Sequence, residues 1–288
     1  MSIVDVTVKL RDVEHRMRFD LDPTRPTEGI MIAFLEGGRL YEPEIAEVFN
    51  RALQPGDTVL DVGANFGMFS VLAARLVGPN GRVVGFEPAS DNVARLAANL
   101  SLNDLANVIV VDRPASDRIG SDTFYLNSDN DGGHSLGNPG INPLHPKSRE
   151  TVRPVAVTTT TIDAEVLRLG LAPPRLIKID TEGAEHRVLA GAVDLLREFE
   201  IPYVIAELNE FALTQLGSSQ AELRGFMADL GYDTFLLYQD GSLPKLVPRD
   251  TRIESDWVIN MLFSTPADVA ALWPRENHDP RKTVPAAP

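Results

Sequence analysis

The sequence predicts an α/β fold in which a mostly parallel sheet carries helices on both faces. Two observations support this prediction. Short apolar segments with the composition of buried strands alternate with longer segments whose apolar residues recur at helical spacing. The first of these strands, residues 58–62, runs directly into a glycine-containing turn. Alternation of this kind joins parallel strands through crossover helices, so that a helix layer covers each face of the sheet.

The order of the elements follows from the apolar pattern. The seven strands expected in the sheet are residues 58–62, 82–87, 108–111, 175–180, 203–208, 232–238 and 257–263. The expected helices are residues 43–53, 69–76, 90–102 and 219–230, with a further helix that buries apolar residues between 188 and 199. Ser90 and Ser219 stand where an N-cap side chain would begin a helix.

The chain divides into three parts. In an N-terminal extension, residues 1–40, alternation of apolar and polar residues over residues 3–21 predicts a β-hairpin. Residues 41–265 form the α/β domain, and residues 266–288 form a proline-rich tail. Within the domain, residues 127–150 are rich in Asn, Gly, Asp and Pro and show no periodicity. Loops of this length in a compact domain are usually functional, so we expect a lid-like loop.

Charge and composition limit the partners. The 288 residues include 27 basic and 41 acidic side chains, a formal net charge of −14. A surface this negative repels nucleic-acid phosphates and anionic lipid headgroups. We therefore expect a small-molecule partner, and neither nucleic acid nor membrane. The absence of cysteine excludes thiolate chemistry and is consistent with a cytoplasmic protein. The oligomeric state, a homodimer included, stays open.

The glycine turn after the first strand is the strongest functional signal. Asp61 lies in that strand, and Gly63 and Gly67 follow it. Open parallel sheets bind ligands at this end of their strands. Glu87 ends the next strand, 26 positions after Asp61. That spacing suits a carboxylate that bonds the ribose hydroxyls of a nucleoside.

A nicotinamide dehydrogenase is the rival interpretation of this turn. Its G-x-G-x-x-G fingerprint has a second glycine where the backbone approaches a pyrophosphate. Asn65 occupies that position here, and Asp61 precedes the turn. A carboxylate repels a pyrophosphate but suits the ammonium of a methionyl group, which favours S-adenosylmethionine as the cofactor. A tight turn without a ligand, or a binding protein without activity, stays open.

A second group of polar residues lies near residue 180. Lys178, Asp180 and Glu182 occupy alternate positions, so their side chains share one face at the end of a strand. One interpretation is a structural ion pair, because an unpaired buried charge is costly. The other is catalysis, with Asp180, Glu182 or Lys178 disposing of an acceptor proton. His134, in the lid-like loop, is a further catalytic candidate.

A metal ion is a third interpretation. Asp180 and Glu207 end strands that we expect to be neighbours. Oxygen ligands at such a place could hold Mg²⁺ against a substrate hydroxyl. The same carboxylates could instead bond sugar hydroxyls directly, so both alternatives stay open.

The chain resembles the FkbM-type methyltransferases, a family of the class I, Rossmann-like S-adenosylmethionine-dependent enzymes. The matching segments are residues 59–67, 85–88, 99–103, 160–163, 177–185 and 188–192. The segment at 177–185, with its Lys-Ile-Asp-Thr-Glu-Gly-Ala-Glu sequence, is the most specific of these. The resemblance covers roughly residues 41–265 and leaves the N-terminal hairpin outside.

This resemblance implies a seven-stranded Rossmann-like sheet with an antiparallel edge formed by its last two strands. It also implies methyl transfer, typically to a hydroxyl of a sugar, glycoside or polyketide. Carboxyl- or N-methylation of a peptide or small molecule, and a catalytically silent nucleoside-binding protein, are the alternatives. The residues expected at the cofactor are Asp61, Gly63, Ala64, Asn65, Gly67, Glu87 and Pro88, with Ser116 and Asp117 at the adenine.

Overall fold

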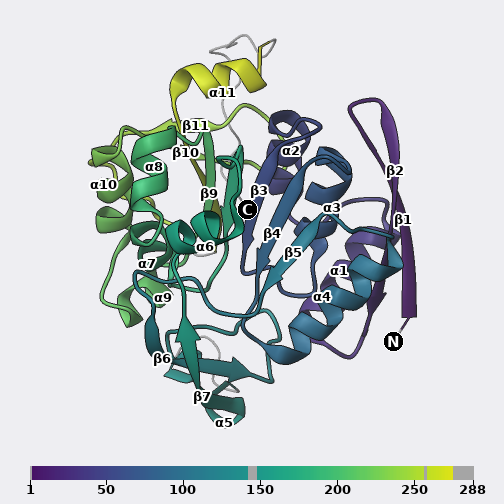
Figure 1. Ribbon diagram of the computed structural model, residues 1–288. Coiled ribbons are helices and arrows are strands. Elements are labelled where there is room, and N and C mark those ends of the chain that lie inside the picture. The colour runs from purple at the N-terminus through teal and green to yellow at the C-terminus, as the bar shows by residue number, and fades with distance from the viewer. Residues whose placement is uncertain (1, 142–147, 256–257, 275–288) are drawn as a thin grey trace.

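The computed structural model describes residues 2–141, 148–255 and 258–274. Its centre is an eight-stranded sheet in the order β11-β10-β12-β9-β8-β3-β4-β5, flanked by helices (Figure 1). The parallel strands are β9 Tyr203–Leu208, β8 Leu176–Ile179, β3 Thr58–Val62, β4 Arg82–Phe86 and β5 Val108–Val111. The mostly parallel α/β fold is therefore confirmed.

The antiparallel edge contains one strand more than expected. β10 Asp233–Leu236 pairs antiparallel with β12 Ile259–Ser264, and β12 pairs antiparallel with β9. β11 Lys245–Val247 adds to β10 at the outer edge. The sheet therefore has eight strands and not the seven that we predicted. β11 was not predicted because a segment of 3 residues is too short to show a two-residue period. Residue 257, the expected start of the last strand, lies outside the described residues.

Helices cover both faces of the sheet. Neighbouring residues of β3 point to opposite faces, Val59 into one apolar cluster and Leu60 into the other. The first cluster is covered by α2 Pro43–Ala52, α3 Met68–Val77, α4 Ser90–Leu102 and α11 Pro266–Leu272. The second is covered by α6 Ile162–Leu169, α7 Glu185–Ala190, α8 Val193–Phe199, α9 Glu210–Gln215 and α10 Gln220–Asp229. Within the described ranges, no helix has the length and apolar composition that a membrane span requires.

The N-terminal extension is a hairpin followed by a helix. β1 Ser2–Leu10 and β2 Val13–Leu21 pair antiparallel, and their inward side chains join the first apolar cluster. The alternation over residues 3–21 therefore predicted this hairpin correctly. Helix α1 Pro26–Glu36 comes next and was not predicted. Gly29 in its first turn weakens the helical pattern of the sequence.

The segment expected as a lid-like loop connects two further strands. β6 Gly120–Asn127 pairs with β7 Val152–Thr159 in a separate two-stranded sheet (Figure 1). The connection contains a 3-10 turn, Pro139–Ile141, and helix α5 Ser148–Thr151. Residues 127–150 are thus largely the connection of a β-hairpin, with residues 142–147 outside the described part.

Candidate active site

Residues at the carboxyl ends of four parallel strands surround a cavity of about 260 Å³, the first cavity. Residues 62–66 end and follow β3, and residues 86–88 end and follow β4. Residues 180–182 follow β8, and Glu207 comes from β9. Ligands bind at this end of open parallel sheets. The residues expected at the cofactor that do line this cavity are Gly63, Ala64, Asn65, Glu87 and Pro88.

The glycine turn lies directly against the end of β8. Gly63 has a φ of 81°, and a Cβ placed on it would lie 1.7 Å from the carbonyl oxygen of Asp180. No residue with a side chain fits in that space, and only glycine adopts this φ without strain. The close approach brings the turn and the residues after β8 into one site.

Glu87 is held in place by two backbone amides. Its carboxylate accepts hydrogen bonds from the N–H groups of Asn65 and Ala89, both at 2.8 Å. The residue is 4% exposed, and burial raises its pKa to about 7. The Asn92 side chain also interacts with this carboxylate, and because a carboxylate has about four acceptor positions, one remains for a ligand hydroxyl. Asn65 adds a buried side-chain oxygen that accepts no hydrogen bond.

Four of the residues expected at the cofactor lie outside the cavity lining: Asp61, Gly67, Ser116 and Asp117. Gly67 begins α3, where a Cβ would meet the side chain of Leu96 at 2.3 Å, so its role is in packing. Ser116 is buried, and its hydroxyl donates to the Asp117 carboxylate at 3.1 Å. The residues just before these two, 114 and 115, line the cavity instead.

In the wall of the first cavity, Lys178 connects two carboxylates. Its Nζ lies 3.0 Å from Asp180 Oδ2 and 3.8 Å from Asp61 Oδ1. Asp61 is fully buried and does not line the cavity, and it accepts the hydroxyl of Ser70 at 2.6 Å. Burial by itself lowers the pKa of Lys178, but the charges of Asp180 and Asp61 raise it above its usual value. The ion pair therefore holds Asp180 in position and favours the charged form of Lys178, which argues against Lys178 as the base.

A second cavity, of about 380 Å³, adjoins the first. The residues that line both are Tyr41, Glu42, Asn130, Glu182 and Glu207. Three carboxylates therefore lie where the cavities meet. Burial, followed by the charge of nearby carboxylates, raises the pKa of Glu42 to about 7 and that of Glu182 to about 8. The same causes raise the pKa of Glu207 well above its usual value.

Glu182 and His134 differ in what they offer a ligand. Glu182 has a positive φ of 54°, and the side-chain amide of Asn209 donates to it at 3.5 Å. His134 lines the first cavity, and its Nδ1 accepts the N–H of Asn127 at 3.0 Å. Burial lowers the pKa of His134, so the ring is neutral with its proton on Nε2. His134 can thus donate a hydrogen bond to a ligand, whereas Glu182 can accept a proton.

The two residues considered as magnesium ligands lie where they were expected. Asp180 follows β8 and Glu207 lies in the neighbouring strand β9. Among the residues that the structure describes, no group of three or more His, Asp or Glu side chains has the arrangement of a metal site. One oxygen of Asp180 is already bound to Lys178.

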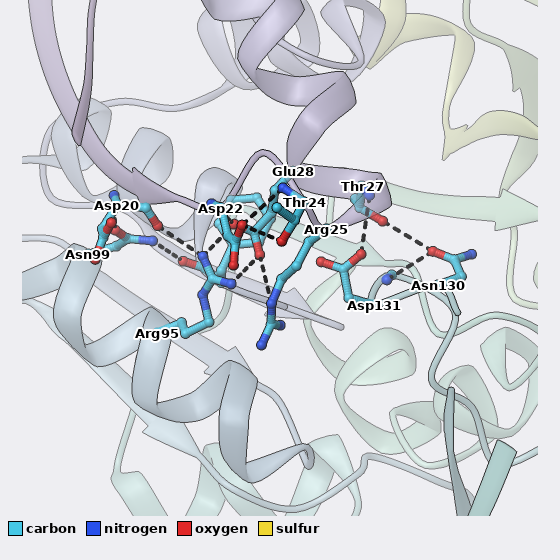
Figure 2. A network of polar contacts seen from close by, with 12 residues as sticks. Asp20, Asp22, Thr24, Arg25, Thr27, Glu28, Arg95, Asn99, Asn130 and Asp131 are labelled. Atoms are coloured by element: carbon cyan, nitrogen blue, oxygen red, sulfur yellow. Dashed lines mark hydrogen bonds and ion pairs between the residues drawn. The ribbon is translucent and has the colours of Figure 1, made fainter. Parts of the chain in front are cut away.

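The N-terminal extension supplies a wall of the first cavity, which the sequence did not indicate. Thr27, Ile30 and Met31 of α1 line it. Figure 2 shows how the start of α1 is attached to the connection between β6 and β7. The Thr27 hydroxyl donates to Asn130 and the Thr27 N–H donates to Asp131, both at 3.1 Å.

A buried ion pair holds the other side of α1. Glu28 is 1% exposed and pairs with Arg95 of α4 (Figure 2). Arg95 also donates to the carbonyl of Asp20 at 3.0 Å, and the N–H of Asp22 donates to Glu28 at 2.6 Å. The helix is therefore fixed between α4 and the β6–β7 connection, with its first turn facing the cavity.

Comparison with known proteins identifies the family. The family model for the methyltransferase FkbM domain matches residues 61–234. The chain belongs to the FkbM methyltransferase family. It is 34% identical over 202 residues to the 31-O-demethyl-FK506 methyltransferase FkbM of Streptomyces tacrolimicus, a match that covers 60% of this chain and 73% of that protein.

Two other proteins are similar to this chain over a shorter range or at lower sequence identity. An arsenite methyltransferase of Halobacterium salinarum is 40% identical over 57 residues, which cover 20% of this chain and 15% of that protein. The crystal structure of methyltransferase FkbM from Methylobacillus flagellatus KT has 16% identity and a TM-score of 0.45. The match covers 76% of this chain, which spans only 50% of that structure's chain.

As an FkbM-type protein, the chain is an S-adenosylmethionine-dependent methyltransferase, and the first cavity fits this cofactor. Glu87 keeps an acceptor position for a ribose hydroxyl, and the Asn65 side-chain oxygen lacks a donor that the methionyl ammonium would supply. The FkbM match includes the strand ends with Asp180, Glu182 and Glu207. Helix α1 and Glu42 lie outside it, so part of the site wall comes from beyond the matched range.

Proposed function

We propose that this FkbM-type methyltransferase methylates a hydroxyl group of a small-molecule acceptor. The observation that carries the proposal is the meeting of three carboxylates, Glu42, Glu182 and Glu207, between the cofactor turn and a second cavity. A hydroxyl must lose its proton when it is methylated, and a carboxylate can accept that proton. The relative from Streptomyces tacrolimicus is named for methylation at an oxygen, which supports the same chemistry here.

Glu182 is our choice for the general base. S-adenosylmethionine supplies the electrophilic methyl group when bound, so the protein has to orient the hydroxyl and take up its proton. Glu182 lines both cavities, and its pKa of about 8 makes it a stronger base than an ordinary carboxylate. Asp180 is bound to Lys178, so it is the second candidate and acts best as an acceptor of hydrogen bonds.

The surroundings of Glu182 support a positioning role for its neighbours. Lys178 holds Asp180 in place at the cavity wall through their contact at 3.0 Å. His134 offers its Nε2 proton to the first cavity and can orient an acceptor oxygen or the cofactor. The net charge of −14 favours a small neutral or cationic molecule as acceptor over a nucleic acid.

The proposal is tested by incubating the protein with methyl-labelled S-adenosylmethionine and a panel of hydroxylated metabolites. We expect a product with one added methyl group on oxygen, located by mass spectrometry and NMR. Glu182→Gln should lower kcat and kcat/KM together by about 10²–10⁴-fold, with S-adenosylhomocysteine affinity nearly unchanged. A methyl group found on nitrogen, or full activity of Glu182→Gln, contradicts the proposal.

A further inference from the structure

We infer that the second cavity is the acceptor chamber and that it selects a hydroxylated acceptor carrying a positively charged amino group. This inference rests on the proposed function and specifies its substrate class. Nothing in the FkbM match assigns this cavity, since much of its wall comes from outside residues 61–234. Four features of the described residues support the inference.

The position of the second cavity suits an acceptor. It does not include the glycine turn or Glu87, which line the first cavity alone. It shares Glu182 and Glu207 with the first cavity, so a molecule bound in it lies next to the proposed base. Asn130 also lines both cavities, and its side-chain oxygen accepts a hydrogen bond from the hydroxyl of Thr27 at 3.1 Å.

The second cavity is lined with acidic residues. The carboxylates that line it are Glu42, Glu44, Glu182 and Glu207, and the part of its lining that the structure describes contains no Lys, Arg or His. Lys178, the buried cation nearby, lines only the first cavity and is bound to Asp180. Carboxylates this close together repel one another, and a cation between them relieves that repulsion.

Two buried carboxylate oxygens in the chamber wall lack a donor. Glu44 is 7% exposed and Glu207 is 8% exposed, and Oε2 of each accepts no hydrogen bond. The amide of Asn260 donates to Glu42 at 3.2 Å and to Glu44 Oε1 at 3.0 Å, which leaves Glu44 Oε2 without a partner. Buried polar atoms are normally hydrogen-bonded, so these two oxygens point to a ligand that brings donors.

An ammonium group matches these requirements better than its alternatives. It carries three donors, no acceptor and a positive charge. A hydroxyl can donate to one oxygen but leaves the repulsion between the carboxylates in place. A carboxylate or phosphate would be repelled, which also disfavours carboxyl methylation. Amide side chains of Asn209, Gln215 and Gln239 and the rings of Phe34 and Phe211 complete a wall suited to a polar, hydroxylated molecule.

The test uses three matched probes, the methyl glycosides of glucosamine, glucose and glucuronic acid. Each is titrated at pH 7 into the full chain loaded with S-adenosylhomocysteine, and binding is followed by NMR. We expect the glucosamine derivative to bind at least about tenfold more tightly than the glucose derivative, and the glucuronic acid derivative to bind weakest. Calorimetry in two buffers of different ionisation enthalpy should show proton release only with the amine, because a cation favours the charged form of nearby carboxylates.

Glu44→Gln and Glu47→Gln form the variant pair. Glu44 lines the second cavity alone, whereas Glu47 lies on the same helix, pairs with Arg51 and lines neither cavity. We expect Glu44→Gln to reduce the preference for the amine severalfold, and Glu47→Gln to keep it. If Glu44→Gln does not fold, the probe series on the unmodified protein still decides.

Two results would overturn the inference. In the first, the glucosamine and glucose derivatives bind with equal affinity. In the second, the protein binds S-adenosylhomocysteine but does not bind the glucosamine derivative. Either result leaves O-methylation of a neutral acceptor intact. A protein that does not bind S-adenosylhomocysteine at all would instead refute the proposed function.

Discussion

Removing the Glu87 carboxylate tests the cofactor site most directly. In Glu87→Ala, the N–H groups of Asn65 and Ala89 lose the oxygens that accept them at 2.8 Å. The ribose hydroxyls lose their charged partner in the same step. Asn65 lies in the glycine turn after β3 and lines the first cavity, so the loss of its hydrogen bond also affects the proposed cofactor site.

The expected magnitude follows from these hydrogen bonds. A hydrogen bond to a charged group contributes ~1.5–3 kcal/mol, so affinity for S-adenosylhomocysteine should fall by about one to two orders of magnitude. A buried amide left without an acceptor costs ~1–3 kcal/mol, so the melting temperature should fall as well. The stability loss has to be separated from the loss of the ligand contact.

Asp163→Ala provides the matched control. The Asp163 carboxylate also accepts two backbone N–H groups, those of Asp194 at 3.1 Å and Leu195 at 3.0 Å, and it lines neither cavity. Calorimetric titration with S-adenosylhomocysteine and thermal denaturation are measured on both variants. Both should melt earlier, and only Glu87→Ala should bind more weakly. Unchanged affinity in Glu87→Ala, or an equal loss in both variants, would refute the cofactor assignment.

Three further predictions concern the base, the wall and the metal. If Glu182 is the base, kcat/KM should rise with pH to a plateau above about 8, and the profile should flatten in Glu182→Gln. Folding raises the pKa of Glu182 from 4.5 to about 8, so the free energy of unfolding falls as pH rises between these values. In urea unfolding, the free energy of unfolding of Glu182→Gln should therefore increase relative to that of the wild type over this pH range. Arg95→Met leaves the buried Glu28 with only the more distant Arg25, 3.8 Å away, which should cost up to ~3–5 kcal/mol in urea unfolding and weaken S-adenosylhomocysteine binding as α1 detaches. Activity should survive EDTA, since Asp180 is already paired with Lys178; a loss that Mg²⁺ restores would instead place a metal at Asp180.

The central sheet was predicted from the sequence because its strands are buried on both faces. β3 and β9 are buried along their whole length and mostly apolar, so they stand out without any alternation. β6 and β7 were missed because they form a small separate sheet whose residues are mostly half-buried or exposed. Their Thr, Ser and Asp residues resemble those of a loop.

Local signals at helix starts were predicted unevenly. Ser219 caps α10 as expected, with its side chain accepting the N–H of Glu222. Ser90 was expected to cap α4, but the cap residue is Ala89, whose N–H donates to Glu87. A carboxylate placed by the preceding strand performs part of the capping role, and this depends on the fold rather than on adjacent residues.

Only those parts of the candidate site that lie in short local motifs could be predicted from the sequence. The glycine turn, Glu87 and the residues after β8 come from local motifs, and they do meet at one cavity. Asp61 was expected at the ligand but lies beneath the floor, because its position in β3 directs it toward α3 and Ser70. Thr27 reaches the site through packing of the extension on the domain, and Glu42 through its position just before α2. No spacing in the sequence signals either contact.

The attachment of α1 has a consequence for how the two ends of the site can change. The strand ends that line the first cavity lie within residues 61–234, whereas Glu42 and Glu44, which line the second cavity, precede them. Exchanging residues 1–57 between members of the family would therefore alter the shape and charge of the second cavity while leaving the glycine turn and Glu87 in place. The exchange would still change the wall that α1 gives the first cavity, so the proposed acceptor and cofactor sites are coupled through α1, which Thr27 and the Glu28–Arg95 pair hold in position.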